Sequence, residues 1–268
     1  MSDTTPHAEF STPEDGIAVM TINRPARLGA YTPRMCEEIL EAVRRVRLDD
    51  DLRVLILTGA GRGFCTGGDV SADAGFAEAL THQIGRAREL REDAHAVVTA
   101  LHHLDKPVLC AVNGIAVNGG LAFALACDIR IVAASARMGD TSARAGLLPD
   151  EGGAWLFPRT MGYDNAFRMV ALSEIYDANE AHRLGLATEV VDDPDLWPRT
   201  LDIARQLAGG APLALRAVKF MMRRAMENTL QASLGDAQQA VLWVGPSADA
   251  AEGKAAFLER RPPKFTGH

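Results

Sequence analysis

The sequence predicts an α/β protein, and three observations support this. Short β-branched apolar runs alternate with helical patterns in the first part of the chain. The 268 residues are 47% apolar and 24% charged, which is enough for a large buried core. After Asp195 the strand signal fades and helical segments dominate. We therefore expect a core over residues 1–195 and a helical region over residues 196–268.

The first elements are predicted in the order strand, helix, strand. Residues 17–22 and 54–58 are β-rich runs. Between them, residues 32–47 carry apolar side chains at helical spacing. Thr32 has the character of an N-cap, and Pro33 suits the first helical turn. A strand, a helix and a second strand in this order are typical of a parallel sheet.

The middle of the chain continues this alternation. A poorly patterned loop is expected from residue 70 to about residue 83, followed by one helix that Lys106-Pro107 ends. One face of that helix is apolar: Leu90, Ala94, Val97, Val98 and Leu101. Residues 108–112 and 128–132 read as strands, and the almost wholly apolar residues 119–127 read as a buried helix between them.

The C-terminal region is predicted to contain helices at residues 196–207, 212–226, 230–243 and 247–259. A helical region of this length either packs on another subunit or forms a layer on the same chain. The pattern alone leaves both arrangements open.

Charge and cysteine usage limit the possible partners. The net charge of −7 argues against nucleic acid as a partner. The polar, acidic start and the lack of a long apolar run predict no membrane association and a cytoplasmic location. The scattered cysteines and the adjacent His102-His103 pair do not have metal-ligand spacing, so no metal is expected. Cys65, in a glycine turn, is a weak candidate nucleophile because no His or Asp is placed nearby to activate it.

Two glycine-dense turns carry the clearest functional signal. Residues 64–69 read FCTGGD and residues 112–120 read VNGIAVNGG, and each turn follows a short apolar run. Such turns can direct free backbone N–H groups at a bound oxygen. If the second turn opens a helix, the N–H groups of Gly68 and Gly119 could form an oxyanion hole. This arrangement favours a reaction through an enolate or a tetrahedral anion.

The segments FCTGGD, NGIAVNGGLAFALACD, GLLPDEGGAWLFPR and FLERRPPKFTG resemble the crotonase (enoyl-CoA hydratase/isomerase) superfamily, in register from Ile17 to Phe265. The resemblance implies a spiral of ββα units, a C-terminal helical region that trimerises, and a coenzyme A thioester substrate held by Gly68 and Gly119. It implies no separate cofactor, since coenzyme A is part of the substrate. We expect a homotrimer or a hexamer.

Two departures from the family pattern bear on the reaction. Hydratases of the family position water with two glutamates, and those positions are Ala122 and Ser142 here. Neither residue can act as a base at neutral pH. An isomerase needs no positioned water, so isomerisation is favoured over hydration. Hydrolysis or dehalogenation through Asp150, and thioester binding without catalysis, remain alternatives.

Asp150 is the first candidate for the working acid, because some relatives carry a functional Asp at this position. Glu151 is expected to point elsewhere, whereas Asp140 could reach the cleft from the end of its strand. Asp69 ends the first turn and should hydrogen-bond local backbone.

The remaining candidates are substrate contacts that the resemblance implies. Positions that meet the coenzyme A nucleotide in relatives are Arg24, Arg27 and Leu28, with Lys254, Phe257 and Lys264 in the tail. Thr66, Gly67, Asp69, Gly120 and Ser142 are expected to line the acyl site. The run from Gly59 to Gly63 lacks the third glycine of a dinucleotide loop, so a nicotinamide enzyme is disfavoured.

Overall fold

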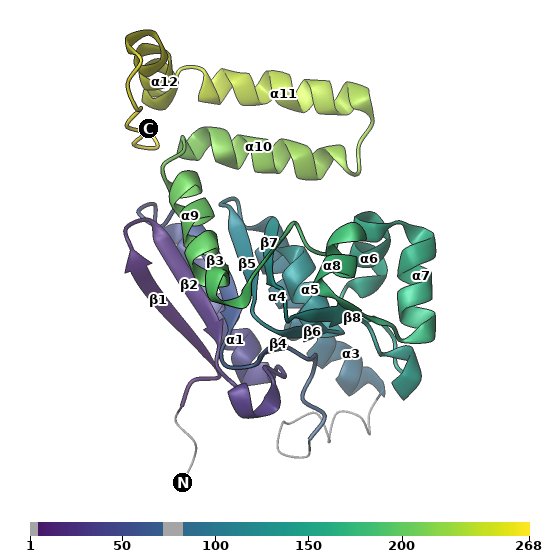
Figure 1. Ribbon diagram of the computed structural model, residues 1–268. Helices are drawn as coiled ribbons and strands as arrows, with labels where there is room; N and C mark the ends of the chain where they lie inside the picture. Colours follow the sequence, from purple (N-terminus) through teal and green to yellow (C-terminus); the bar gives the residue numbers. More distant parts are fainter. Residues whose placement is uncertain (1–4, 72–82) are drawn as a thin grey trace.

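The computed structural model describes residues 5–71 and 83–268, and these form two β-sheets surrounded by helices, with a projecting helical arm (Figure 1). The larger sheet has the strand order β1-β2-β3-β5-β7-β10. Its strands are β1 (Ala8–Glu14), β2 (Ile17–Ile22), β3 (Val54–Gly59), β5 (Val108–Val112), β7 (Ile129–Ala133) and β10 (Glu189–Val191). The smaller sheet contains β4 (Gly63–Cys65), β6 (Ile115–Val117), β8 (Arg137–Gly139) and β9 (Ile175–Asp177).

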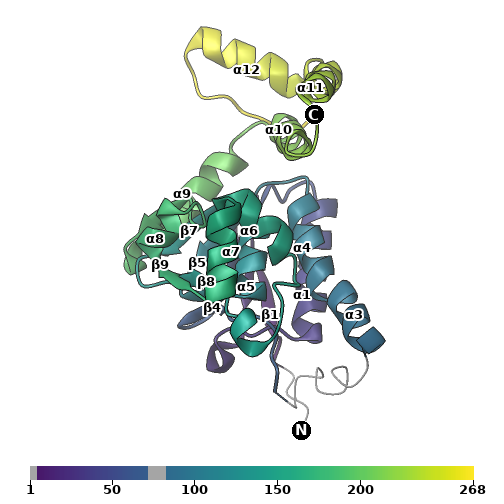
Figure 2. The same ribbon diagram turned by 90° about the vertical axis from the view of Figure 1, so that its right-hand side faces the viewer.

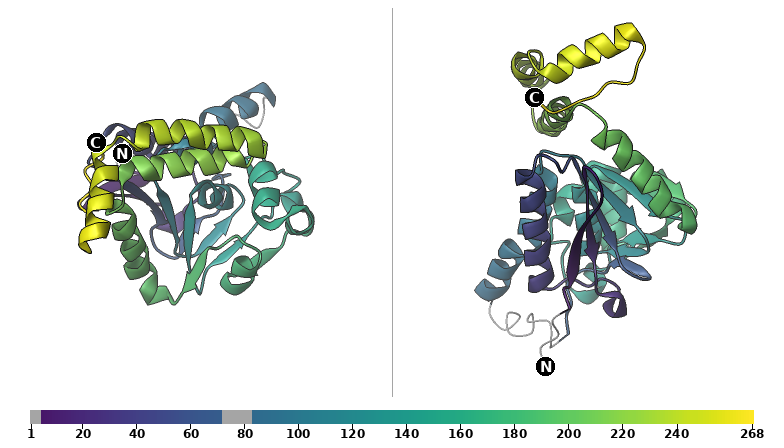
Figure 3. Two further views of the ribbon diagram at one scale, coloured as in Figure 1. Left: turned by 90° about the horizontal axis from the view of Figure 1, so that it is seen from above. Right: turned by 90° about the vertical axis from the view of Figure 1, so that its left-hand side faces the viewer.

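The central strands of the larger sheet are parallel and buried, which explains their nearly continuous apolar sequence. β1 pairs antiparallel with β2 at the edge. Helix α1 (Pro33–Leu48) packs against β1, β2 and β3, and α9 (Leu196–Ala208) packs against β2, β3, β5 and β7. The right-hand view of Figure 3 shows these two helices on opposite faces of the sheet.

The smaller sheet lies beside α5 (Gly119–Ala126), every residue of which is buried. Helices α4 (Ala94–His103) and α6 (Gly153–Met161) pack against α5 (Figure 2). Short helices complete this side of the core: α7 (Tyr163–Leu172) and α8 (Ala178–Arg183), with 3-10 turns at Pro25–Arg27, Ala143–Ala145 and Asp193–Asp195. The buried α5 therefore starts and ends inside the protein.

The arm consists of α10 (Pro212–Ala225), α11 (Leu230–Val244) and α12 (Ala248–Glu259), with α10 and α11 side by side. Figures 1 and 2 show it projecting beyond the core. Helix α9, although part of the predicted helical region, packs on the sheet itself. Among the described residues, no helix is long and apolar enough to cross a membrane.

The predicted strands and the C-terminal helices are confirmed to within about two residues. The single helix expected before Lys106 is wrong: Asp93, with φ −101° and ψ −91°, separates α3 (Gln83–Glu92) from α4. Asp93 interrupts the helical dihedrals, which a pattern of apolar spacing does not reveal. The loop expected over residues 70–83 lies mostly outside the described residues.

Candidate active site

The two glycine turns lie against each other. β4 and β6 are neighbouring parallel strands, and each leads directly into one turn. A Cβ atom built on Gly67 would lie 3.1 Å from the Asn118 Cβ atom and 3.5 Å from the Gly119 nitrogen. Parallel pairing brings the ends of both strands to one edge of the sheet, so turns that are some fifty residues apart in sequence become adjacent.

Both expected N–H donors are available. The Tyr31 N–H donates to the Gly67 carbonyl at 2.8 Å and the Asp69 N–H donates to the Tyr31 carbonyl at 2.9 Å, so the intervening Gly68 N–H faces the other way. Gly119 is the first residue of α5, where N–H groups lack a partner within the helix. Among the described residues, neither N–H has a hydrogen-bond acceptor. The geometry suits an oxyanion hole.

Asn118 holds the second turn in an unusual conformation. It has φ 54° and ψ −127°, which is strained for a residue with a side chain. Its side-chain oxygen accepts hydrogen bonds from the Thr141 N–H at 2.7 Å and from the Thr141 hydroxyl at 3.1 Å. These bonds secure the turn, so the orientation of the Gly119 N–H depends on the chain that follows β8.

Tyr31 lies beneath both glycines. A Cβ atom on Gly68 would lie 3.4 Å from the Tyr31 hydroxyl, and one on Gly119 would lie 2.7 Å from the Tyr31 ring. The ring also packs against Phe123 of α5, with centroids 5.2 Å apart. Sequence reasoning missed this residue because nothing near it in the chain distinguishes it from an ordinary loop aromatic.

Glu151 points into the site, contrary to the expectation that it would point elsewhere. Its side chain accepts a hydrogen bond from the Tyr31 hydroxyl at 3.1 Å and is 7% exposed. The chain turns at Gly152, with φ 103°, before α6 begins, and this turn leaves Glu151 facing the core. Burial raises the pKa of Glu151 to about 7, and the nearby Asp150 charge adds to the increase.

Asp150 precedes Glu151 in the chain, and Asp140 interacts with Asp150. Asp150 is half-buried, and its backbone carbonyl accepts a hydrogen bond from His95 Nε2 at 2.6 Å. Asp140, directly after β8, is fully buried, and its Oδ1 accepts a hydrogen bond from the Ser142 N–H at 2.9 Å. Burial, with the charge of Asp150 in addition, raises the Asp140 pKa. Asp150 is the most exposed of the three and so the most accessible to a substrate.

Ala122 and Ser142 are both buried, and neither adds a carboxylate to this group. Ser142 is engaged by the Asp140 side chain. The carboxyl groups of the site therefore come from residues 140, 150 and 151, and not from the two positions that hydratases of the resembled family use.

Asp69 and Arg24 form an ion pair at the side of the first turn, at 2.7 Å. Burial opposes ionisation of Asp69, but hydrogen bonds from Ser71 and the Arg24 guanidinium outweigh it and hold the pKa at about 2. The Ser71 N–H donates to Asp69 at 3.0 Å, as expected for a residue that bonds local backbone. Arg24 also donates to the Ala30 carbonyl at 2.6 Å, so both side chains are occupied in holding the loop.

The other predicted contacts divide into two groups. Near the turns lie Arg27, which is exposed, and Leu28 and Thr66, which are half-buried. Gly120 is a packing residue, since a Cβ atom there would lie 2.0 Å from the Cys65 carbonyl oxygen. In contrast, the exposed Lys254 and Phe257 on α12, and Lys264 beyond it, belong to the arm, and the single chain does not bring them to the turns (Figure 1).

The cysteines are free and buried. Burial raises the pKa of Cys65 to about 12, so its thiol stays neutral and is a poor nucleophile despite its place in the first turn. Within the described parts of the chain, no group of three or more His, Cys, Asp or Glu side chains is arranged to hold a metal ion.

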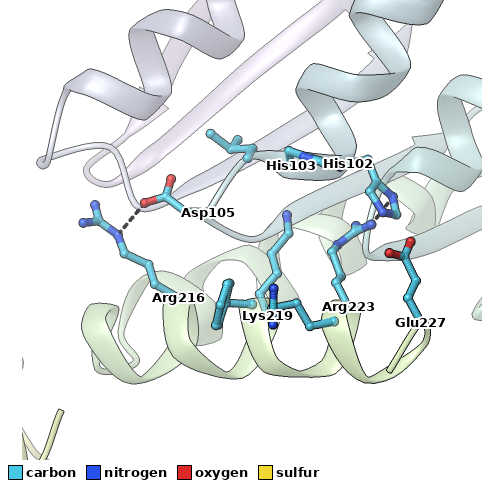
Figure 4. A pocket seen from close by; sticks show the side chains of 10 residues that line it. His102, His103, Asp105, Arg216, Lys219, Arg223 and Glu227 are labelled. Carbon is cyan, nitrogen blue, oxygen red and sulfur yellow. Dashed lines mark hydrogen bonds and ion pairs between the residues drawn. The ribbon is translucent and has the colours of Figure 1, made fainter. Parts of the chain in front are cut away.

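His102 and His103 line a cavity of about 270 Å³ between α4 and α10 (Figure 4). His102 Nδ1 meets the Arg223 guanidinium, and its ring packs edge-on against Trp155 at 5.3 Å. Burial, and then the charge of Arg223, lowers the His102 pKa to about 4. The pair therefore belongs to the packing of the arm on the core.

The fold and the paired turns define an acyl-CoA enzyme of the crotonase type. The chain belongs to the enoyl-CoA hydratase/isomerase family, whose sequence profile matches residues 12–268. It is 38% identical to 1,2-epoxyphenylacetyl-CoA isomerase of Escherichia coli K12, over 95% of this chain and 96% of the relative.

Other relatives carry the name of a hydratase. The chain is 34% identical to (E)-benzylidenesuccinyl-CoA hydratase of Thauera aromatica, over 94% of this chain and 96% of that protein. Among solved structures, the enoyl-CoA hydratase of Bacillus anthracis superimposes with a TM-score of 0.92 at 28% identity, covering 98% of this chain and all of that chain. The predicted family and fold class are thus confirmed, while the relatives do not distinguish isomerase from hydratase.

Proposed function

We propose that the protein is an isomerase that moves a proton, and with it a double bond, along the acyl chain of a coenzyme A thioester. The observation that carries the proposal is the pair of free N–H groups at Gly68 and Gly119. The carboxyl groups of this region do not lie at the two positions where hydratases of the family carry glutamates. The N–H groups would stabilise the enolate oxygen, each by about 3–4 kcal/mol.

Asp150 serves as the general acid/base in this proposal. Its carboxylate removes a proton from one carbon of the acyl chain, and the electrons of the broken C–H bond move onto the thioester oxygen. Asp150 then returns the proton to another carbon, and the double bond changes place. No water enters the reaction, which agrees with the absence of acids at positions 122 and 142.

The names of two relatives suggest which substrates to test. Both 1,2-epoxyphenylacetyl-CoA isomerase and (E)-benzylidenesuccinyl-CoA hydratase are named for acyl groups with an aromatic ring. A substrate panel should therefore pair straight-chain 3-enoyl-CoA thioesters with aryl-substituted ones.

The test is Asp150→Asn, which keeps size and polarity but removes the titratable group. We expect thioester binding to persist and isomerisation to fall by about 10²–10⁴-fold. Hydration of crotonyl-CoA by the unaltered enzyme should be far slower than a typical turnover of about 10 per second. Steady-state assays on the panel, with calorimetric binding, measure all three quantities.

Three outcomes would contradict the proposal. Full activity of the Asn variant would remove Asp150 from the reaction. A covalent acyl or aryl adduct on Asp150, found by mass spectrometry, would indicate hydrolysis or dehalogenation instead. Tight thioester binding without turnover across the panel would indicate a binding protein.

A further inference from the structure

Tyr31 and Glu151 form a buried pair directly below the oxyanion turns. The Tyr31 hydroxyl donates to Glu151 Oε1 at 3.1 Å, and the two residues are 1% and 7% exposed. A Cβ atom on Gly119 would lie 2.7 Å from Glu151 Oε1 and 2.7 Å from Tyr31 Cε1. The pair thus touches the residue whose N–H would hold the thioester oxygen.

Glu151 also interacts with Asp150. The two residues are neighbours in the chain, and the charge of Asp150 adds to burial in raising the pKa of Glu151. Glu151 is the more deeply buried of the two, and burial is the largest cause that disfavours its charged form. Burial and repulsion therefore both favour the protonated form of Glu151.

The titratable groups around Glu151 come from several elements. Among the described residues, Tyr31 and the neutral thiol of Cys65 on β4 interact with it, in addition to Asp150. Asp140, at the end of β8, interacts with Asp150, and His95 on α4 bonds the Asp150 carbonyl. Glu151 should thus lose its proton near pH 7, because its pKa is about 7.

We propose that the Tyr31–Glu151 pair is a positioning unit that keeps a proton on Glu151 beside Asp150, so that Glu151 adds no second negative charge next to the enolate. The proposal rests on the proposed function. When Asp150 takes the substrate proton, a C–H bond breaks, an O–H bond forms on Asp150, and the electron pair moves to the thioester oxygen. Glu151 keeps its own proton throughout, so it adds no negative charge beside the enolate.

The first test is the pH profile of kcat for Glu151→Gln. In the unaltered enzyme we expect kcat to fall as the pH rises through about 7, because ionisation of Glu151 places a second negative charge beside Asp150 and the enolate. Gln donates the same hydrogen bond but does not titrate, so this decline should disappear. At pH values below this decline, the kcat of Glu151→Gln should be lower than that of the unaltered enzyme by less than about 10-fold. That loss is smaller than the effect of removing a general base.

Glu41→Gln is the matched control, because Glu41 is 70% exposed on α1 and forms a surface ion pair with Arg44 at 3.5 Å. Its profile should equal that of the unaltered enzyme. A basic decline that persists in Glu151→Gln, or a uniform loss at every pH, would overturn the proposal.

The second test removes the hydroxyl with Tyr31→Phe, which keeps the ring under Gly68 and Gly119. The hydroxyl stabilises the ionised form of Glu151 by donating to it, so its loss should move the decline to higher pH. Tyr163→Phe, at a tyrosine that is 69% exposed, is the control. An unchanged midpoint in Tyr31→Phe would contradict a role for the pair.

A third measurement needs no substrate. In carbon-13 spectra of glutamate-labelled protein, the carboxyl signal lost in Glu151→Gln should titrate near 7 in the unaltered protein, and at lower pH in Asp150→Asn. A midpoint near 4.5 in an active enzyme would refute the role of a protonated Glu151 and leave the proposed function standing. A midpoint near 7 without turnover of any thioester would refute the proposed function instead.

Discussion

At the scale of single residues, neighbouring glycines in one turn have different physical roles. Gly119 supplies a free N–H, whereas Gly120 allows α5 to approach the backbone of β4. A side chain at Gly120 would overlap the Cys65 carbonyl, which belongs to a buried strand and cannot move aside. The second role is structural, so it should be visible in stability and not only in activity.

We predict that Gly120→Ala destabilises the protein by about 3 kcal/mol or more, because overpacking against backbone leaves no room to relax. Gly235→Ala is the control, since a Cβ atom there meets nothing within 4 Å and the residue lies inside α11. That change should be neutral or stabilising by up to about 1 kcal/mol. Urea unfolding curves measure both, and equal effects of the two substitutions would contradict the packing role.

At the scale of elements, the two ends of α5 have different roles, one in the candidate site and one in the contact with the arm. Its N-terminus carries the Gly119 N–H, one of the two proposed oxyanion donors, and Asp128 follows its C-terminus. Asp128 pairs with Lys219 at 2.7 Å and with Arg223 at 2.7 Å, both on α10, and accepts a hydrogen bond from the Val108 N–H at 2.8 Å. Arg223 also donates to the Ala126 carbonyl at 3.2 Å, a favourable place for a cation at a helix end. Asp128 thus connects the arm to the helix that carries the site.

We predict that Asp128→Asn loosens the attachment of the arm. The substitution removes the carboxylate that neutralises two half-buried cations, at a cost of about 1–3 kcal/mol. Hydrogen exchange should accelerate in α10–α12 while β3 and β5 stay protected.

Asp236→Asn serves as the control for that experiment. Asp236 pairs at 2.8 Å with Arg224, whose side chain is 50% exposed, and such pairs contribute less than about 1 kcal/mol. Uniform acceleration in Asp128→Asn, including the central strands, would show that Asp128 stabilises the core and not the arm.

At the scale of the whole molecule, the arm exposes more apolar surface than a stable monomer usually leaves in water. Large apolar side chains that are at least 44% exposed lie along it: Val218, Phe220, Met222, Met226, Leu230, Leu234, Val241, Leu242, Trp243, Phe257 and Leu258. We therefore expect these helices to pack against other copies of the chain. Lys254 and Phe257 would then be available to a site in a neighbouring copy.

The expected assembly is built on trimers. Light scattering should give a mass of three or six times 28.7 kDa. Replacing Met222 and Met226, which are 66% and 64% exposed, with Lys should shift the mass toward that of the monomer, because charges would have to be buried. A monomer that persists at high concentration without any substitution would contradict the expectation.

The sequence by itself determined the family, the α/β class, the arm helices and the two N–H donors, because these depend on local patterns and on motifs that are continuous in the chain. Short strands such as β4 and β9 were not predicted, since three residues carry too little pattern.

Only the tertiary structure decided which acid enters the site and what supports it. Glu151 and Tyr31 are 120 residues apart, and their contact depends on how the turn at Gly152 meets the loop before α1. No local spacing encodes such a contact. The pKa of Glu151 likewise follows from burial, which is a property of the packed core and not of the residue's neighbours in the chain.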